Sequence, residues 1–284
     1  MYWTRQLIPD SLELKEASST LYFAGQYITM AANQCIEKKD DESHTNAIWN
    51  SEKNWLIGNA IDSPYGNIHI AIDYPLLALL ICNDELKPIA EIELVGKTRL
   101  EAFNWLNNQM WKLGLEVKGF EMEVQYDLPE HALTEGAKFE MEVPKHFLEL
   151  ANYRSNGHYA LSKVSEKFND KSELRVWPHH FDEGILINIA YTNNLASAQI
   201  SMGLAIPDQY YDQPYFYVNP WKLTGVNSES LPPLESKGIW RTEGWIGQVL
   251  LAETFSSVVL HEEQEKLVIE FLNEAIENCL AILK

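Results

Sequence analysis

The chain has 284 residues, of which 46% are hydrophobic, so it can bury a sizeable core and is not expected to be disordered. Acidic residues outnumber basic residues by 41 to 22, which gives a formal net charge of −19. A charge of this sign and size repels phosphate backbones and anionic lipids. We therefore expect no nucleic-acid partner and no membrane partner.

The expected compartment is a reducing cytoplasm. The longest apolar run, residues 75–82, is far shorter than the roughly 20 residues that cross a bilayer. The first residues contain no apolar signal core. Cys35, Cys82 and Cys279 are widely spaced, as in proteins that form no disulfides. We expect a monomer or homodimer whose cysteines are buried side chains and not nucleophiles.

The first half of the chain begins with a long helix. A capping signal at Asp10 and apolar positions at helical spacing predict this helix over residues 11–37, before a charged loop at 38–46. A capping box formed by Thr98 and Glu101 predicts a second helix, which Gly114 ends. Between the two helices, alternating or continuous apolar patterns predict strands at 55–61, 67–73, 76–82 and 88–95.

The second half shows a similar order of elements. Residues 120–126 predict a strand with one wet face, and the acidic, Gly- and Pro-containing stretch 127–144 is the expected boundary between halves. A loop is expected at 222–244. The helices of this half are predicted at 146–168 and 262–283. Its strands are predicted at 173–191 (with a break near Gly184), 198–206, 215–219 and 245–251.

Strands that follow one another without intervening helices indicate an α+β fold with mainly antiparallel sheets and long flanking helices. The predicted domains are two similar helix–strands–helix halves, 1–127 and 128–284, with one compact domain as the alternative. No Walker-type phosphate loop and no strand-borne G-x-G-x-x-G motif is present. Nucleotide binding through these motifs is therefore not predicted.

The most informative stretch is Arg175–Glu183, which places two histidines and two carboxylates beside Trp177 and Phe181. If the stretch is extended, Trp177, His179 and Phe181 face the core, and His180 and Asp182 face the other side. A His–Asp pair of this spacing suits a general base held by its carboxylate, or a shared metal ion. A structural hydrogen bond is the more common alternative.

The following strands predict a pocket beside this pair. Residues 199–205 alternate apolar side chains with a side of mostly small residues that includes Ser201, which leaves space next to His180 and Asp182. Polar and aromatic side chains that could wall this space are Asp208, Tyr215, Tyr217 and Trp221. Arg154 and His158 interrupt an apolar helical stripe and could add a buried charge that pairs with Asp182 or Asp208.

Each of these features also has a plainer interpretation. Runs of Tyr and Trp more often form core or interface, and Arg154 and His158 can lie at the edge of the stripe and reach water. An H-x-D pair also begins the iron triad of non-haem oxygenases, but the triad needs a distal histidine. His261 stands at a predicted helix start and does not fit that role.

A family resemblance rests on three short motifs. Trp177-Pro178-His179-His180-Phe181-Asp182, Ser201-Met202-Gly203 and the segment from Pro214 to Trp221 resemble the signature of an uncharacterised bacterial family. Members of that family carry W-P-x-H-F-D, S-x-G and P-Y-x-Y-V-x-P-W motifs. The resemblance implies that residues 177–221 form one unit. It implies no particular chemistry.

The leading functional hypothesis is a cytoplasmic small-molecule-binding protein or enzyme. Its catalytic residues would be His180 and Asp182, and its remaining site residues would be Asp208, Tyr215, Tyr217, Trp221, Ser201, Arg154 and His158. The aromatic side chains would hold an apolar or sugar-like ring, and the sequence identifies no cofactor. The alternative is a non-enzymatic interaction module whose Tyr- and Trp-rich segment forms a protein interface.

Overall fold

The structure is a computed structural model that describes residues 3–115, 122, 124, 126–228 and 231–284. It has an α+β fold with antiparallel strand pairs, which confirms the predicted class. The helices are α1 (Ser11–Cys35), α2 (Arg99–Lys112), α3 (Pro144–Ser165), α4 (Ala252–Ser256) and α5 (His261–Leu283), with a 3-10 turn, η1 (Ala132–Glu135). The strands are β1 (Ala47–Asn50), β2 (Trp55–Gly58), β3 (Ile68–Asp73), β4 (Ala78–Asn83), β5 (Pro88–Glu93), β6 (Arg175–Trp177), β7 (Asp182–Thr192), β8 (Leu195–Ala205), β9 (Tyr215–Lys222), β10 (Ile239–Arg241) and β11 (Gly247–Leu251).

The chain divides into two compact units that interleave in sequence. The N-unit comprises Glu13–Ala151 and Val176–Phe181, and the C-unit comprises Met1–Leu12, Asn152–Arg175 and Asp182–Lys284. The division passes through α3, whereas the predicted halves, 1–127 and 128–284, were contiguous. The two predicted halves, with one compact domain as the alternative, stay a prediction.

The N-unit places α1 against a sheet of strand order β6-β1-β2-β3-β4-β5. Gly58 in β2 allows this packing, because a Cβ there would lie 2.6 Å from a methyl group of Ile28 in α1. The Tyr27 hydroxyl donates a hydrogen bond of 3.0 Å to the carbonyl of Arg99, at the start of α2. That helix begins with the predicted capping box between Thr98 and Glu101.

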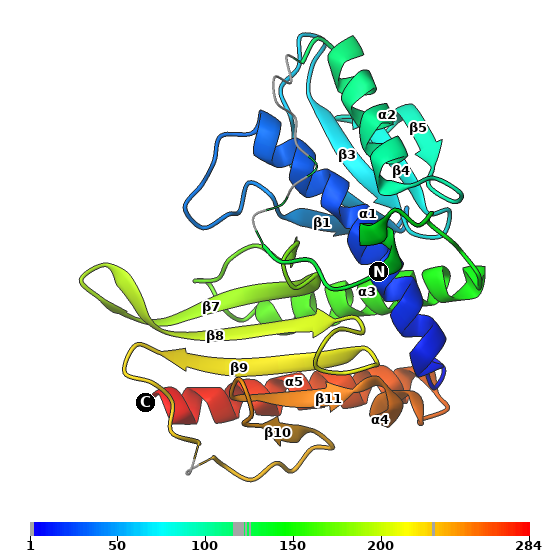
Figure 1. The fold of residues 1–284 in the computed structure, drawn as a ribbon. Coiled ribbons are helices and arrows are strands. Elements are labelled where there is room, and N and C mark those ends of the chain that lie inside the picture. The colour runs from blue at the N-terminus through cyan, green and yellow to red at the C-terminus, as the bar shows by residue number, and fades with distance from the viewer. Residues whose placement is uncertain (1–2, 116–121, 123, 125, 229–230) are drawn as a thin grey trace. The chain divides into compact units, whose positions relative to one another are not determined.

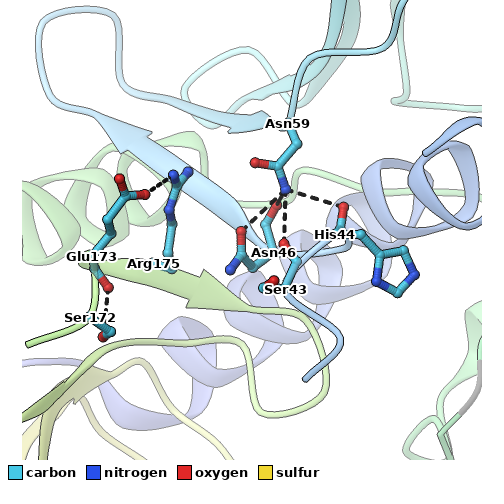
Figure 2. A network of polar contacts seen from close by, with 7 residues as sticks. All are labelled: Ser43, His44, Asn46, Asn59, Ser172, Glu173 and Arg175. Atoms are coloured by element: carbon cyan, nitrogen blue, oxygen red, sulfur yellow. Dashed lines mark hydrogen bonds and ion pairs between the residues drawn. The ribbon is translucent and has the colours of Figure 1, made fainter. Parts of the chain in front are cut away.

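One side chain organises the charged loop before β1. The Asn59 Nδ2 lies 3.1 Å from the carbonyl oxygens of Ser43, His44 and Asn46, as Figure 2 shows. An amide that satisfies several carbonyl groups holds the loop in one shape without secondary structure. Figure 2 also draws the ion pair between Arg175 and Glu173 in the C-unit.

The C-unit contains a sheet of strand order β10-β11-β9-β8-β7, and helices α3 and α5 pack on one face of it. Figure 1 shows α5 running alongside β9 and β11. Gly157 in α3 meets Leu204 of β8, where a Cβ would lie 2.5 Å from the Leu204 side chain. Gln248 of β11 donates to the carbonyl of Ala275 in α5 over 3.0 Å. Along each strand, every second side chain points away from these helices. We call the side of the sheet that carries these side chains the open face.

Several elements differ from the sequence prediction. Strand β1 was not predicted. Strand β10 lies within the predicted loop at 222–244, and α4 directly follows the predicted strand at 245–251. The predicted strand at 120–126 falls largely on residues 120, 121, 123 and 125, which lie outside the described residues. Within the part of the chain that the structure describes, no helix has the length and apolar composition needed to cross a bilayer.

Candidate functional site

The central motif forms a turn and not the predicted continuous strand. Strand β6 ends at Trp177 and β7 begins at Asp182. The Phe181 amide donates to the Trp177 carbonyl over 2.7 Å, and Phe181 has a positive φ of 55°. His179 and His180 are consequently both exposed, so the alternation that put His180 and Asp182 on one face does not exist here.

Phe181 is the buried anchor of this turn. Its ring packs on α1 in the N-unit, where a Cβ at Gly25 would lie 2.7 Å from the ring edge. It also meets the ring of Tyr22 edge-on, with centroids 5.5 Å apart. The predicted core position of Phe181 is therefore confirmed, although the backbone reaches it by a turn. The same prediction is wrong for His179, which is exposed, and Trp177 is only partly buried.

The open face of the C-unit carries most of the other predicted site residues. Strand register places Gly203 opposite both Gly184 and Tyr217, and Ser201 opposite Asn219. Since directly opposed residues project on the same side of a sheet, this face gathers one group of side chains. The group contains Asp182 on β7, Gln199 and Ser201 on β8, and Tyr215, Tyr217, Asn219 and Trp221 on β9.

Asp182 pairs with Tyr217, whose hydroxyl donates a short hydrogen bond to the Asp182 carboxylate. Gly203 makes room for the phenol, because a Cβ there would lie 2.5 Å from the hydroxyl oxygen. Gly184 on β7 also makes room, because a Cβ there would lie 2.9 Å from the same hydroxyl oxygen. The space that the small residues were predicted to leave is therefore filled by the Tyr217 side chain.

The environment of Tyr217 keeps its phenol protonated. Burial raises the pKa of Tyr217 well above its ordinary value, and the negative charge of Asp182 raises it further. A hydrogen bond with Ser201 acts in the opposite direction but does not outweigh them. Tyr217 is therefore a permanent hydrogen-bond donor at ordinary pH.

A second carboxyl–phenol pair lies nearby. The Tyr215 hydroxyl donates to Asp208 over 2.7 Å, and the backbone amides of Tyr210 and Tyr211 donate to the same carboxyl over 2.7 and 3.1 Å. Burial nevertheless raises the pKa of Asp208, because it outweighs these hydrogen bonds, and the charge of Asp182 adds to the increase. The two carboxyl groups therefore act on each other and belong to one cluster.

Arg241 and Trp245 complete the cluster, and the sequence did not identify them. The Arg241 guanidinium lies 4.8 Å from the ring centroid of Tyr210 and 5.7 Å from that of Trp245. The Trp245 ring is 6.2 Å from that of Tyr217. Arg241 lies in the predicted loop at 222–244, and Trp245 is the first residue of the strand predicted at 245–251. No sequence pattern singled out either residue. We call Asp182, Asp208, Tyr210, Tyr211, Tyr215, Tyr217, Arg241 and Trp245 the acid–tyrosine cluster.

The remaining predicted residues occupy other places. Trp221 lies on the open face opposite Gln199 and is 42% exposed. Arg154 is fully buried in α3. The Nδ1 of His158 lies 2.6 Å from Glu183, which is also fully buried. Because Glu183 points from β7 toward the helix-covered face, His158 lies on the side of the sheet opposite the Asp182 carboxylate.

The His158–Glu183 pair joins a partly buried histidine to a fully buried carboxyl group. Burial alone would lower the pKa of His158, but the hydrogen bond and the charge of Glu183 raise it overall. Glu183 was not singled out from the sequence, although it follows Asp182 directly. Because neighbouring residues of a strand point to opposite faces, its position next to Asp182 indicated that Glu183 would face the core.

The N-unit contains a separate acidic cavity of about 300 Å³. His146 lies in it, 2.8 Å from Glu13 and 3.1 Å from Glu149. Glu16, Glu140 and Glu142 also line it. Across the described residues, no group of three or more His, Cys, Asp or Glu side chains is placed to hold a metal ion.

Comparison with known proteins adds no relative to this picture. No protein-family model, no curated protein and no solved structure matched the chain.

Proposed function

We propose that the C-unit binds a small molecule on its open face, at the acid–tyrosine cluster. The observation that carries the proposal is the pairing of two carboxyls with two phenols on neighbouring strands, Asp182 with Tyr217 and Asp208 with Tyr215. A few convergent polar groups among aromatic side chains are typical of ligand sites. Cytoplasmic location, which the three free cysteines support, is part of the same proposal.

The two carboxyls differ in a way that supports an enzymatic form of the proposal. The pKa of Asp208 is raised, mainly by burial. Asp182 is the carboxylate whose charge contributes to that increase. A pair of this kind can donate a proton to one atom of a ligand and accept one from another. His180 has no part in this form, because it belongs to the N-unit and the proposal rests on the C-unit alone.

The test is a thermal-shift screen of the full chain against a panel of neutral metabolites, followed by calorimetry on each hit. We expect at least one compound to raise the melting temperature of the wild-type protein and to leave that of Asp182→Asn unchanged. The matched control is Glu265→Gln on α5, a carboxylate that also accepts a tyrosine hydroxyl, from Tyr159, away from the open face. An equal loss of response in both variants would contradict a site at Asp182.

A second candidate is a protein interface, which the exposure of Trp221 and Leu223 favours. In that case the wild-type protein would be a homodimer in light scattering, and Trp221→Ala would be a monomer. A monomer at all concentrations would remove this candidate in its homodimeric form.

A further inference from the structure

We propose that the ligand of the open face is a neutral saccharide of more than one ring, which lies along β9 from Tyr217 to Trp221. This inference rests on the proposed function and names the chemical class of its ligand. It is carried by the polar and aromatic side chains that continue from the acid–tyrosine cluster along the open face.

The strip is longer than the cluster itself. Tyr217, Asn219 and Trp221 alternate along β9 and therefore share the open face. Four residues of strand span roughly 13 Å, since each residue adds about 3.3 Å. An aromatic ring at each end, with an amide between them, offers successive contacts to an extended ligand.

Trp221 supplies an apolar platform at the far end. It is 42% exposed, although a tryptophan side chain on a strand next to a hydrophobic core is usually covered. One face of a sugar ring presents C–H groups, and its edge presents hydroxyl groups. A flat indole beside hydrogen-bonding side chains matches that division into an apolar face and a polar edge.

The polar partners beside Trp221 are amides held in fixed orientations. Gln199, directly opposite Trp221, donates to the Asn188 side-chain oxygen over 2.8 Å. Asn188 in turn donates to Asp170 over 2.8 Å, and Asp170 also accepts the Tyr191 hydroxyl over 2.7 Å. Gln199 and Asn188 are both partly exposed. An amide carries donors and acceptors together, which is what neighbouring hydroxyl groups require.

The charge of the face excludes an anionic ligand. Asp182 and Asp170 place carboxylates on or beside the strip, and the open-face positions of β7, β8 and β9 carry no lysine or arginine. Arg241 is engaged by aromatic rings at the cluster end. Phosphorylated or carboxylated sugars would meet repulsion from the carboxylates without a cation from these three strands to offset it.

The experiment measures binding of defined saccharides to the full chain by isothermal titration calorimetry. The neutral probes are cellohexaose, maltohexaose, xylohexaose and their monosaccharides, and the anionic probe is an oligogalacturonate. We expect saturable binding of at least one neutral hexasaccharide, about tenfold or more tighter than its monosaccharide, and no binding of the anionic probe.

Two tryptophan variants provide the matched pair. Trp221→Ala should weaken hexasaccharide binding by about tenfold or more, as expected for an aromatic anchor. Trp111→Ala removes a tryptophan that is 74% exposed in α2 of the N-unit, and it should leave binding unchanged. Both variants should keep the wild-type melting temperature, because both side chains are solvent-exposed.

The outcomes separate this inference from the proposed function. If no neutral saccharide binds, or if Trp111→Ala weakens binding as much as Trp221→Ala, the saccharide inference is wrong. If a different metabolite binds and Asp182→Asn abolishes its binding, the proposed function stands without the saccharide. If neither saccharides nor metabolites bind, both fail.

Discussion

The hydroxyl of Tyr217 on β9 reaches the carboxylate of Asp182 on β7 across strand β8, because Gly203 and Gly184 along this path have no side chains. A Cβ at Gly203 would also lie 2.5 Å from the carbonyl oxygen of Glu183. The two glycines and the phenol therefore form one packed unit, and the position of Asp182 on the open face depends on all three.

The two phenol–carboxyl pairs should contribute unequally to stability. Tyr217→Phe removes a hydrogen bond to Asp182 and should lower the free energy of unfolding by about 1.5–3 kcal/mol, the range for hydrogen bonds to charged groups. Tyr215→Phe should cost less, because Asp208 keeps the amide donors of Tyr210 and Tyr211. Urea denaturation of both variants measures the difference. A larger loss for Tyr215→Phe would contradict the assignment of Tyr217 as the main partner of Asp182.

The His158–Glu183 pair predicts a pH dependence of stability with a definite sign. The pKa of His158 is raised in the folded protein above its ordinary value of 6.5. A raised pKa means that the contribution is fully present below about pH 6.5 and is lost as the pH rises through the folded value. The stability advantage of the wild-type protein over His158→Gln should therefore be largest at pH values below about 6.5 and decline as the pH rises above that value, as measured by denaturant melts at each pH.

The control for this effect is the same comparison in a Glu183→Gln background. Without the buried carboxylate, the factor that raises the pKa of His158 is absent. The stability difference between the Glu183→Gln variant and the double variant that also carries His158→Gln should then lose its decline with pH. An advantage that grows with pH in the wild-type background would contradict the assigned direction.

The fold could be predicted where a single periodicity governs a long segment. Helices α1, α3 and α5 and strands β3 and β5 follow directly from the spacing of apolar residues, and each was placed within a few residues of its observed bounds. Strands β1 and β10 were missed because they are three or four residues long. Segments of that length are defined by the partner strand, which sequence spacing does not reveal.

The candidate site could be predicted in part for the same reason. Tyr215 and Tyr217 share a face because β9 is regular, and this alternation is visible in the sequence. The relation of His180 to Asp182 was mispredicted because Phe181 adopts a positive φ, which a bulky residue rarely does. Arg241 could not be found, since its partners come from residues about 30 positions earlier in the chain.

The cysteines should be unreactive in the native protein. Burial raises the pKa of Cys35 to about 11, that of Cys82 to about 11 and that of Cys279 to about 12. At pH 8 the thiolate fraction of each is therefore very small, and thiolates are the reactive species. Titration with a chromogenic disulfide reagent should label all three thiols quickly in guanidinium and slowly without it. Cys82 and Cys279 are buried as expected, whereas Cys35 is only partly buried. Rapid labelling of native Cys82 or Cys279 would contradict the burial of that side chain.

The last prediction separates the structural and functional parts of the central motif by comparing Phe181→Ala with Asp182→Asn. Phe181 is 4% exposed and packs on Gly25, so its truncation leaves a cavity in the N-unit and should cost about 3–5 kcal/mol. Asp182→Asn preserves volume and an oxygen that can accept the Tyr217 hydroxyl, so it should cost only about 1 kcal/mol. Denaturant melts of the two variants measure both values. If Asp182→Asn loses ligand binding and Phe181→Ala keeps it, the Asp182 carboxylate has a role beyond folding. Equal and large losses of stability in both variants would instead make Asp182 part of the scaffold, because a residue needed only for binding can change without unfolding the chain.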